Sequence, residues 1–211
     1  MRGCIMGAAT AIGVTLALLQ PLTNDALAGD RAVRSLLEMR HERVVQQEWD
    51  LSCGAAALTT LLRYQHGIDV TEREVAVGLI AQTRYVENPA VIRLRHGFSL
   101  LDLKRFVDRL GLQGVGFGRL DVDDLVERAP IIVPISSNGY NHFVVFRGRW
   151  GNRVLLGDPA FGNRTMTVDR FERLWLDYGD IGHVGFVVAS AGGSSPPGAL
   201  SPAEHHFVML R

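Results

Sequence analysis

Four side chains in this sequence could together carry out nucleophilic chemistry. Cys53 stands where the polar segment 46–52 changes to a run of small apolar residues and strong helix formers. A helix begins with unpaired backbone N–H groups and partial positive charge, which favour the thiolate form of a cysteine. Gln47, six residues earlier, carries an amide that could form an oxyanion hole together with a backbone N–H. The plain alternative is a buried core cysteine, since free cysteine is often no more than a small apolar residue.

A thiol nucleophile needs a base and a third group that orients the base. His142 begins the apolar run 142–148, and Asp158 ends the next run, 153–158. Short turns between these runs predict an antiparallel meander, in which the start of one strand lies beside the end of its neighbour. We therefore expect His142 and Asp158 to lie side by side. The alternative is a satisfied core histidine and an unrelated turn aspartate before a proline.

The remaining histidines compete with His142 for the role of base. His183 also precedes an apolar run, 184–188, and is the main rival. We expect the others at the surface, because they fall in exposed or irregular stretches: His41, His66, His96, His205 and His206. No three His or Asp residues show metal-ligand spacing, so the sequence predicts no metal. The glycines in 112–120 lack the following Lys-Ser/Thr of a phosphate loop, and we expect no nucleotide or other cofactor.

The first residues predict export. A basic start is followed by an apolar run, Cys4–Leu19, a proline and the small-x-small sequence Ala26–Ala28. This order is typical of a signal peptide, assigned to 1–28, although a retained membrane anchor is the alternative. Cleavage would leave about 180 residues, enough for one domain, with Cys53 as the single thiol. We therefore expect a periplasmic protein without an internal disulfide.

Composition and periodicity predict an α+β domain. Lys+Arg and Asp+Glu are equal at 22 each, which does not favour nucleic acid or an anionic membrane as partner. Helical patterns come first and strand patterns follow, with an N-terminal arm at 29–43, the domain at 44–190 and a flexible Gly/Ser/Pro-rich tail at 191–211. The expected helices are 53–66, 71–83, 100–110, 121–128 and 168–178, and the expected strands are 112–120, 130–135, 142–148, 153–158, 165–168 and 184–189.

Three motifs carry a resemblance to a known family. They are Gln47-x5-Cys53-Gly54-x-Ala56, then Gly139–Val145, then Gly157–Ala160 followed by Gly162. In this order they resemble the C39 family of cysteine peptidases, over about Val44 to Val188. The resemblance implies a papain-like fold, with an N-terminal helical half packed on a C-terminal antiparallel sheet. It also implies Cys53 as nucleophile, His142 as base, Asp158 as its orienter and Gln47 as oxyanion donor.

The chain resembles one group within this family more closely than the others, and the activity of that group differs from that of many family members. Many members are domains of peptide-exporting transporters that cut leaders after a Gly-Gly pair. With its export signal and the segment Arg95–Lys104, this chain resembles the stand-alone, exported members found beside functional amyloid secretion systems. The implied partner is a polypeptide, such as an amyloid subunit, cut after small residues while unfolded. The open alternatives are a non-catalytic peptide-binding or chaperone module of the same fold and transglutaminase-like acyl transfer.

Overall fold

The computed structural model describes residues 34–82, 86–88, 90, 97–137, 139–192 and 198–210. The expected signal peptide, the start of the arm and the first two residues of the segment 95–104 lie outside the described residues. Within these ranges, no helix has the length and apolar character needed to cross a bilayer.

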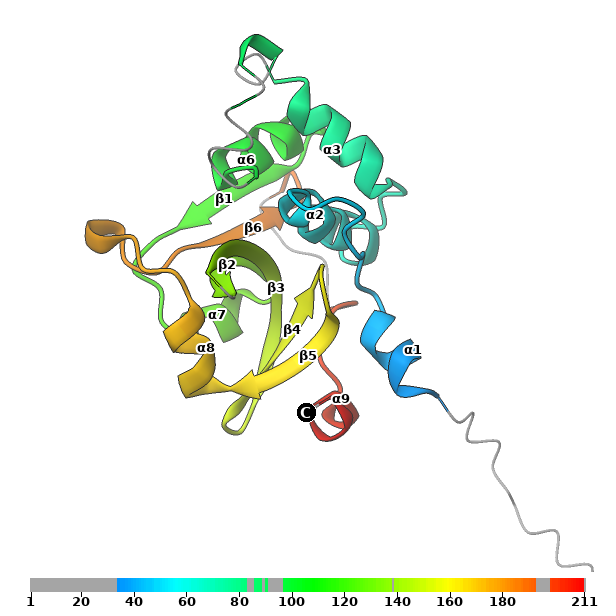
Figure 1. Ribbon diagram of the computed structural model, residues 1–211, viewed down its shortest axis with the longest axis vertical. Coiled ribbons are helices and arrows are strands. Elements are labelled where there is room, and N and C mark those ends of the chain that lie inside the picture. The colour runs from blue at the N-terminus through cyan, green and yellow to red at the C-terminus, as the bar shows by residue number, and fades with distance from the viewer. Residues whose placement is uncertain are drawn as a thin grey trace, which may run out of the picture. The chain divides into compact units, whose positions relative to one another are not determined.

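A six-stranded antiparallel sheet forms the centre of the domain (Figure 1). Strands β2 to β5 follow one another as a meander, and β6 returns along the other side, between β1 and β2. The predicted meander over 130–158 is therefore confirmed. The strands are β1 Gln113–Phe117, β2 Ile131–Ser137, β3 Tyr140–Trp150, β4 Arg153–Asp158, β5 Gly162–Thr167 and β6 Gly185–Ala189.

Helices cover both faces of the sheet. α2, α3 and α6 share one hydrophobic core with the sheet, and α7 and α8 share the other (Figure 1). The helices are α1 Leu36–His41, α2 Cys53–Tyr64, α3 Glu72–Ile80, α6 Leu100–Arg109, α7 Val122–Arg128, α8 Val168–Leu174 and α9 Glu204–Met209. The α+β prediction is confirmed, with the helices α1 to α6 preceding the sheet in the chain.

Residues 131–135 of β2 and 144–146 of β3 are apolar without interruption because both faces of the sheet are buried there. Ile132 and Val145 belong to the core beneath α2, whereas Val133 and Val144 belong to the core beneath α8. Neighbouring residues of a strand point to opposite faces, so a strand covered on both sides needs apolar residues at every position. This burial holds β2 and β3 in register, and the register positions the residues at the end of β3.

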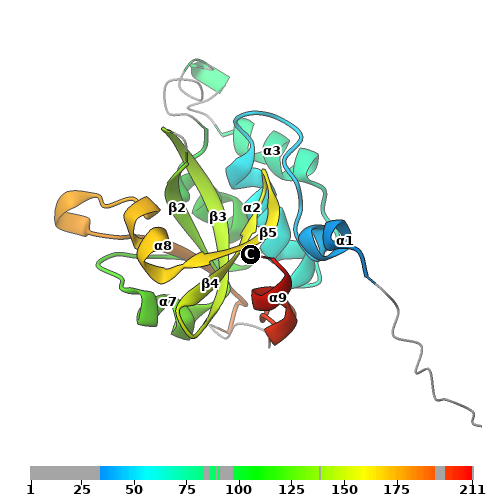
Figure 2. The same ribbon diagram turned by 60° about the horizontal axis from the view of Figure 1, so that its bottom comes forward.

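The C-terminal residues are ordered, so the prediction of a flexible tail is wrong for 198–210. Phe207 and Leu210 form a small core with Met39 of α1 and Leu155 of β4, and Figure 2 shows α9 beside β4 and close to α1. The Leu210 carbonyl also accepts a hydrogen bond from the Thr165 backbone N–H at 3.0 Å. The Gly/Ser/Pro composition of 192–202 predicted a flexible tail, but a short apolar segment follows it. This segment packs against α1 and β4, which lie beside it only in the folded chain.

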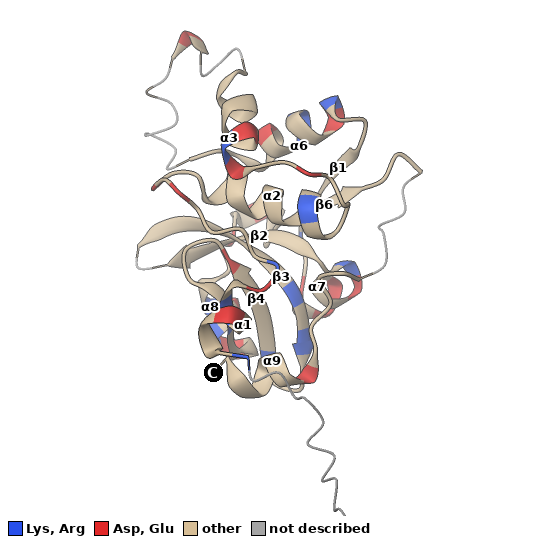
Figure 3. Ribbon diagram, turned by 90° about the vertical axis from the view of Figure 1, so that its right-hand side faces the viewer, with Lys and Arg blue, Asp and Glu red and all other residues tan. Residues whose placement is uncertain are grey.

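Charged side chains of both signs are interspersed over the elements seen in Figure 3. Some form ion pairs at the surface, such as Arg149 with Asp123 at 2.8 Å and Lys104 with Asp108 at 2.9 Å. Exposed pairs contribute little to stability. The fold therefore depends mainly on the apolar cores on the two faces of the sheet.

Candidate active site

Cys53 is the first residue of α2, as the sequence predicts. The first ten residues of this 12-residue helix are buried, and Cys53 itself is 5% exposed. Ser52 precedes the helix, and its hydroxyl donates to the Trp49 carbonyl at 2.8 Å instead of capping the helix. The first backbone N–H groups of α2 therefore have no side-chain cap from Ser52, next to the thiol.

His142 and Asp158 are in contact, as the meander predicts. Nε2 of His142 and Oδ1 of Asp158 are 2.7 Å apart, and the Asp158 carboxylate is fully buried. The same Oδ1 accepts the Ala160 backbone N–H at 2.9 Å, which fixes the carboxylate at the end of β4. Because Nε2 is engaged, Nδ1 is the imidazole nitrogen left for Cys53, with which His142 also interacts.

The environment favours the charged forms of both His142 and Asp158. Burial alone would lower the pKa of His142, but hydrogen bonds to Asp158 and Cys53, together with their charges, raise it to about 9. Burial alone would raise the pKa of Asp158, but His142, Arg164 and the Ala160 N–H hold it below its ordinary value. At neutral pH the pair is therefore an imidazolium and a carboxylate.

Gln47 is fixed between the Cys53 turn and the loop that follows Asp158. Its backbone N–H donates to the Pro159 carbonyl at 2.9 Å, and its side-chain Nε2 donates to the Trp49 carbonyl at 3.0 Å. Its Oε1 is buried without a hydrogen-bond partner among the described residues. A primary amide has two N–H groups, and the bond to the Trp49 carbonyl uses one of them.

The rival base His183 lies elsewhere. Its ring stacks on Trp175, with 4.5 Å between ring centroids, and its Nδ1 lies 3.3 Å from the Leu176 carbonyl. His183 is not among the residues that line the cleft at Cys53.

The expectation that His206 lies at the surface is wrong. His206 is only 4% exposed, because α9 packs against the domain.

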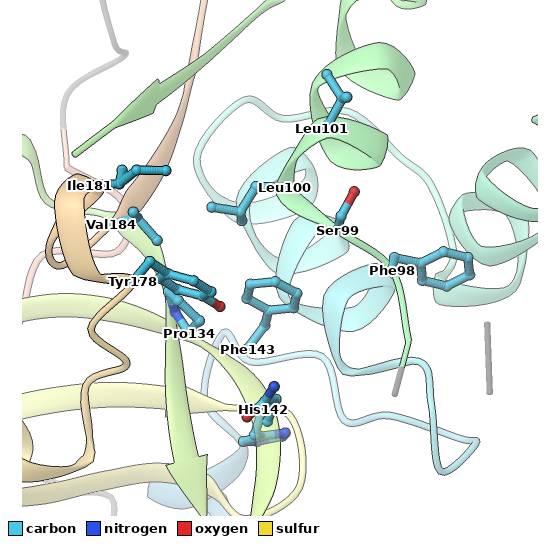
Figure 4. A pocket seen from close by; sticks show the side chains of 11 residues that line it. Phe98, Ser99, Leu100, Leu101, Pro134, His142, Phe143, Tyr178, Ile181 and Val184 are labelled. Atoms are coloured by element: carbon cyan, nitrogen blue, oxygen red, sulfur yellow. The ribbon is translucent and has the colours of Figure 1, made fainter. Parts of the chain in front are cut away.

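Two hollows meet at His142. One of about 450 Å³ contains Cys53 and is lined by Leu51, Tyr140 and Phe161 among others; we call it the Cys53 hollow. The other, of about 350 Å³, is lined mainly by apolar side chains from the start of α6 and from the segment before β6. Figure 4 shows the Phe143 ring pointing into this second hollow, with His142 at its edge. Together the hollows form a cleft that passes the thiol and the imidazole.

Arg164 belongs to the site, although the motifs did not include it. It lies on β5, and its Nη2 is 2.6 Å from Oδ2 of Asp158. A charged residue within the otherwise uncharged strand Gly162–Thr167 was a signal in the sequence. Its partner, however, depends on the register between β4 and β5, in which Asp158 pairs with Gly162.

One cluster outside the cleft has the composition of a metal site. Glu42, His205 and His206 place one ligand atom each within 4.8 Å of the others. Nδ1 of His206 accepts the Ala203 backbone N–H at 3.0 Å, so its Nε2 carries the proton and faces Glu42 at 3.3 Å. Since the lone pair that a metal needs is not available on either nitrogen, the cluster is arranged as a hydrogen-bonded link between α9 and the N-terminal segment.

Comparison with known proteins agrees with this geometry. The Peptidase C39 family matches residues 41–179. A protein of Pseudomonas aeruginosa PAO1 named "Probable functional amyloid protease FapD" is 36% identical over 146 residues, which is 69% of this chain and 62% of that protein. A protein of Pseudomonas fluorescens with the same name is 34% identical over 175 residues, or 76% of this chain and 75% of that protein. This chain thus spans less than two thirds of the P. aeruginosa relative.

Solved structures share the fold. The peptidase domain of Streptococcus ComA, a bifunctional ABC transporter, aligns over 71% of this chain and 99% of its own, with a TM-score of 0.55 and 18% identity. A double glycine motif protease from an AMS/PCAT transporter, in complex with the leader peptide, aligns over 70% of this chain and 90% of its own, with a TM-score of 0.54 and 23% identity. The expected C39 peptidase fold is confirmed. From its sequence match and its fold, the chain belongs to the Peptidase C39 family of cysteine peptidases.

Proposed function

We propose that this protein is an exported cysteine endopeptidase in which Cys53 attacks the carbonyl carbon of a peptide bond. His142 is the imidazolium that holds the proton given up by the thiol, and it passes this proton to the leaving amine, while Asp158 fixes the orientation of the ring. The amine leaves and a thioester joins Cys53 to the acyl part of the substrate. Water, activated by His142, then hydrolyses the thioester and restores the thiol.

The 2.7 Å contact between His142 and Asp158, with Cys53 on the other side of the ring, carries this proposal. A raised histidine pKa of about 9 keeps the imidazolium at neutral pH, which stabilises a neighbouring thiolate. The three groups come from three elements, α2, β3 and β4. A chain without turnover has no need for a buried carboxylate aimed at this imidazole.

The oxyanion of the tetrahedral intermediate needs donors beside the thiol. We assign this role to the Cys53 backbone N–H at the start of α2 and to the second N–H of the Gln47 amide. The supporting observation is that Gln47 is held at both its backbone and its side chain, by Pro159 and Trp49. A donor that is already fixed needs no reorganisation as negative charge develops.

The substrate we propose is an unfolded polypeptide cut after small residues. Cys53 is only 5% exposed, and Leu51, Tyr140 and Phe161 line the hollow around it. A bulky side chain next to the scissile bond would meet these walls before the carbonyl carbon reached the sulfur. An extended chain can lie along a cleft of two hollows, whereas a folded domain is too wide. A protease with this fold was solved in complex with its leader peptide, which supports a polypeptide as the substrate.

We place the protein in the periplasm, acting on a secreted partner such as an amyloid subunit. The support is the apolar N-terminal run with its small-x-small site and the name of the two Pseudomonas relatives. An amyloid subunit must stay unfolded until it assembles, so it would present the extended segments that the cleft requires.

The test is a digest of unfolded candidate partners with the wild-type protein and with Cys53→Ala, analysed by mass spectrometry. We expect new termini after glycine, alanine or serine with the wild-type protein alone. Phe161→Ala, which widens the Cys53 hollow, should admit larger residues before the cut. Tyr178→Ala removes a comparable ring from the other hollow and should leave this preference unchanged.

The outcomes separate the alternatives. Identical digests with wild-type protein and Cys53→Ala would overturn the peptidase proposal, and retained binding of the peptide would then favour a binding module. Products linked to an added amine, in place of hydrolysed termini, would indicate acyl transfer. Cuts after large aromatic residues would refute the small-residue preference while leaving the peptidase intact.

A further inference from the structure

The Arg164 guanidinium lies directly behind the candidate catalytic carboxylate. The two oxygens of Asp158 have different partners: Oδ1 faces His142 at 2.7 Å, and Oδ2 faces Nη2 of Arg164 at 2.6 Å. Asp158 is fully buried, while the Arg164 side chain is 25% exposed. The approach to Oδ2 lies outside hydrogen-bond angles, so the contact is an ion pair held by charge and packing.

We propose that Arg164 is a positioning residue for the peptidase reaction, which keeps Asp158 ionised and aimed at His142 and also supports one wall of the cleft. This inference rests on the proposed function of Cys53, His142 and Asp158. Arg164 does not touch the reacting atoms and acts only through its neighbours.

The first step of the argument is the cost of a buried carboxylate. Without Arg164, Oδ2 of Asp158 would face no other cation within salt-bridge distance among the described residues. A buried charge without a partner is relieved by protonation or by rotation toward another donor. Either change weakens the hydrogen bond to Nε2 of His142. The tautomer and direction of the imidazole therefore depend on the residue behind the carboxylate.

The second step is the contact between Arg164 and the cleft wall. The guanidinium carbon of Arg164 lies 5.1 Å from the centroid of the Phe161 ring, in cation–π contact. Phe161 is 52% exposed and lines the hollow that contains Cys53. An exposed aromatic ring on a loop has few other contacts to hold it, so Arg164 connects the position of this wall with that of the carboxylate.

Charge gives a signature that distinguishes this role from a purely structural one. Removing the cation beside Asp158 makes this carboxylate easier to protonate, so activity is lost mainly at low pH. Loss of packing alone lowers activity by a similar factor at all pH values. Arg164→Lys keeps the charge, and Arg164→Met keeps much of the length without it.

The first experiment compares kcat against pH for wild type, Arg164→Met and Arg164→Lys, with the peptide that the wild-type protein cuts. We expect Arg164→Met to lose about tenfold in kcat at pH 5.5 and no more than about threefold at pH 8.5. Arg164→Lys should keep the wild-type profile at reduced height, and its KM should rise because the flat contact with Phe161 is lost. Arg149→Met removes an arginine from an ion pair with an exposed aspartate and is the matched control, with an unchanged profile. If the kcat of Arg164→Met is lower than that of wild type by the same factor at every pH, the inference is wrong.

A second experiment needs no substrate. In the Cys53→Ala background, the His142 imidazole is titrated by NMR with and without Arg164→Met. We expect the variant to titrate at lower pH, because an Asp158 that is protonated or turned away no longer stabilises the imidazolium, and an unchanged titration with the fold intact would refute the inference. If the proposed function is wrong, wild type and Cys53→Ala will cut the substrate equally. The titration measures only the His142 imidazole, so its result does not depend on whether the protein is a peptidase.

Discussion

The contact between His142 and Asp158 makes a quantitative prediction about stability. Asp158→Asn keeps the shape of the side chain and removes the negative charge that holds the imidazolium. The pKa of His142 rises from 6.5 to about 9 in the folded protein. At 1.36 kcal/mol per pH unit this rise is worth about 3 kcal/mol of unfolding free energy. Cys53 supplies part of this rise and burial opposes it, so about 3 kcal/mol is the order of magnitude of the pH-dependent loss in Asp158→Asn.

The sign follows from the direction of the pKa change. A histidine whose pKa is higher in the folded state stabilises that state fully below the unfolded value, near pH 6.5. This stabilisation is lost as the pH rises through about 9, where the folded imidazolium gives up its proton. The advantage of the wild type over Asp158→Asn is therefore large at pH 6 and small at pH 10. A part independent of pH remains, because Arg164 loses its charged partner in the variant.

The assay is urea unfolding at intervals from pH 6 to pH 10, followed by tryptophan fluorescence under reducing conditions. Trp175 is 3% exposed and packs on Phe171, so its emission reports the core. Asp123→Asn is the matched control, since Asp123 pairs with Arg149 at the surface and its loss should cost little at any pH. A stability difference for Asp158→Asn that stays constant, or grows, between pH 6 and pH 10 would refute the reasoning.

Three further predictions concern reactivity and packing. Iodoacetamide at pH 7 should label Cys53 faster than a free-cysteine peptide, and His142→Asn should remove the difference; equal rates for the wild type would argue against an activated thiol. Asn163→Ala should lower the unfolding free energy by about 2–4 kcal/mol, because the buried Arg147 loses its 2.6 Å partner; a urea midpoint within error of wild type would contradict this. Phe207→Ala should cost about 3–4 kcal/mol and expose the α9 amides to hydrogen exchange, whereas a loosely attached tail would leave both unchanged.

The sequence predicted the elements because each depends on local chemistry. The polar-to-apolar change at Cys53 predicts the start of α2, and Thr71 with Glu74 predicts the capping box that begins α3, as the structure confirms. Apolar runs separated by short turns predict the meander β2–β3–β4, and the meander in turn predicts the contact between His142 and Asp158. Only the nearest neighbours along the chain and the pairing of adjacent strands enter this reasoning. The roles assigned to the site residues remain predictions for the experiments above.

The tertiary structure alone decided the contacts that join distant segments. Arg164 reaches Asp158 through the β4–β5 register, and Asn163 joins the carbonyls of Met39 and Glu42 to β5. The ordered helix α9 depends in the same way on an apolar surface formed by Met39 and Leu155. Periodicity shows which face of an element is buried, but it carries no information about which polar group or apolar patch from elsewhere will lie against that face. Such partners are selected when the whole chain packs, because a buried charge or an exposed apolar residue becomes favourable only once its partner is in place.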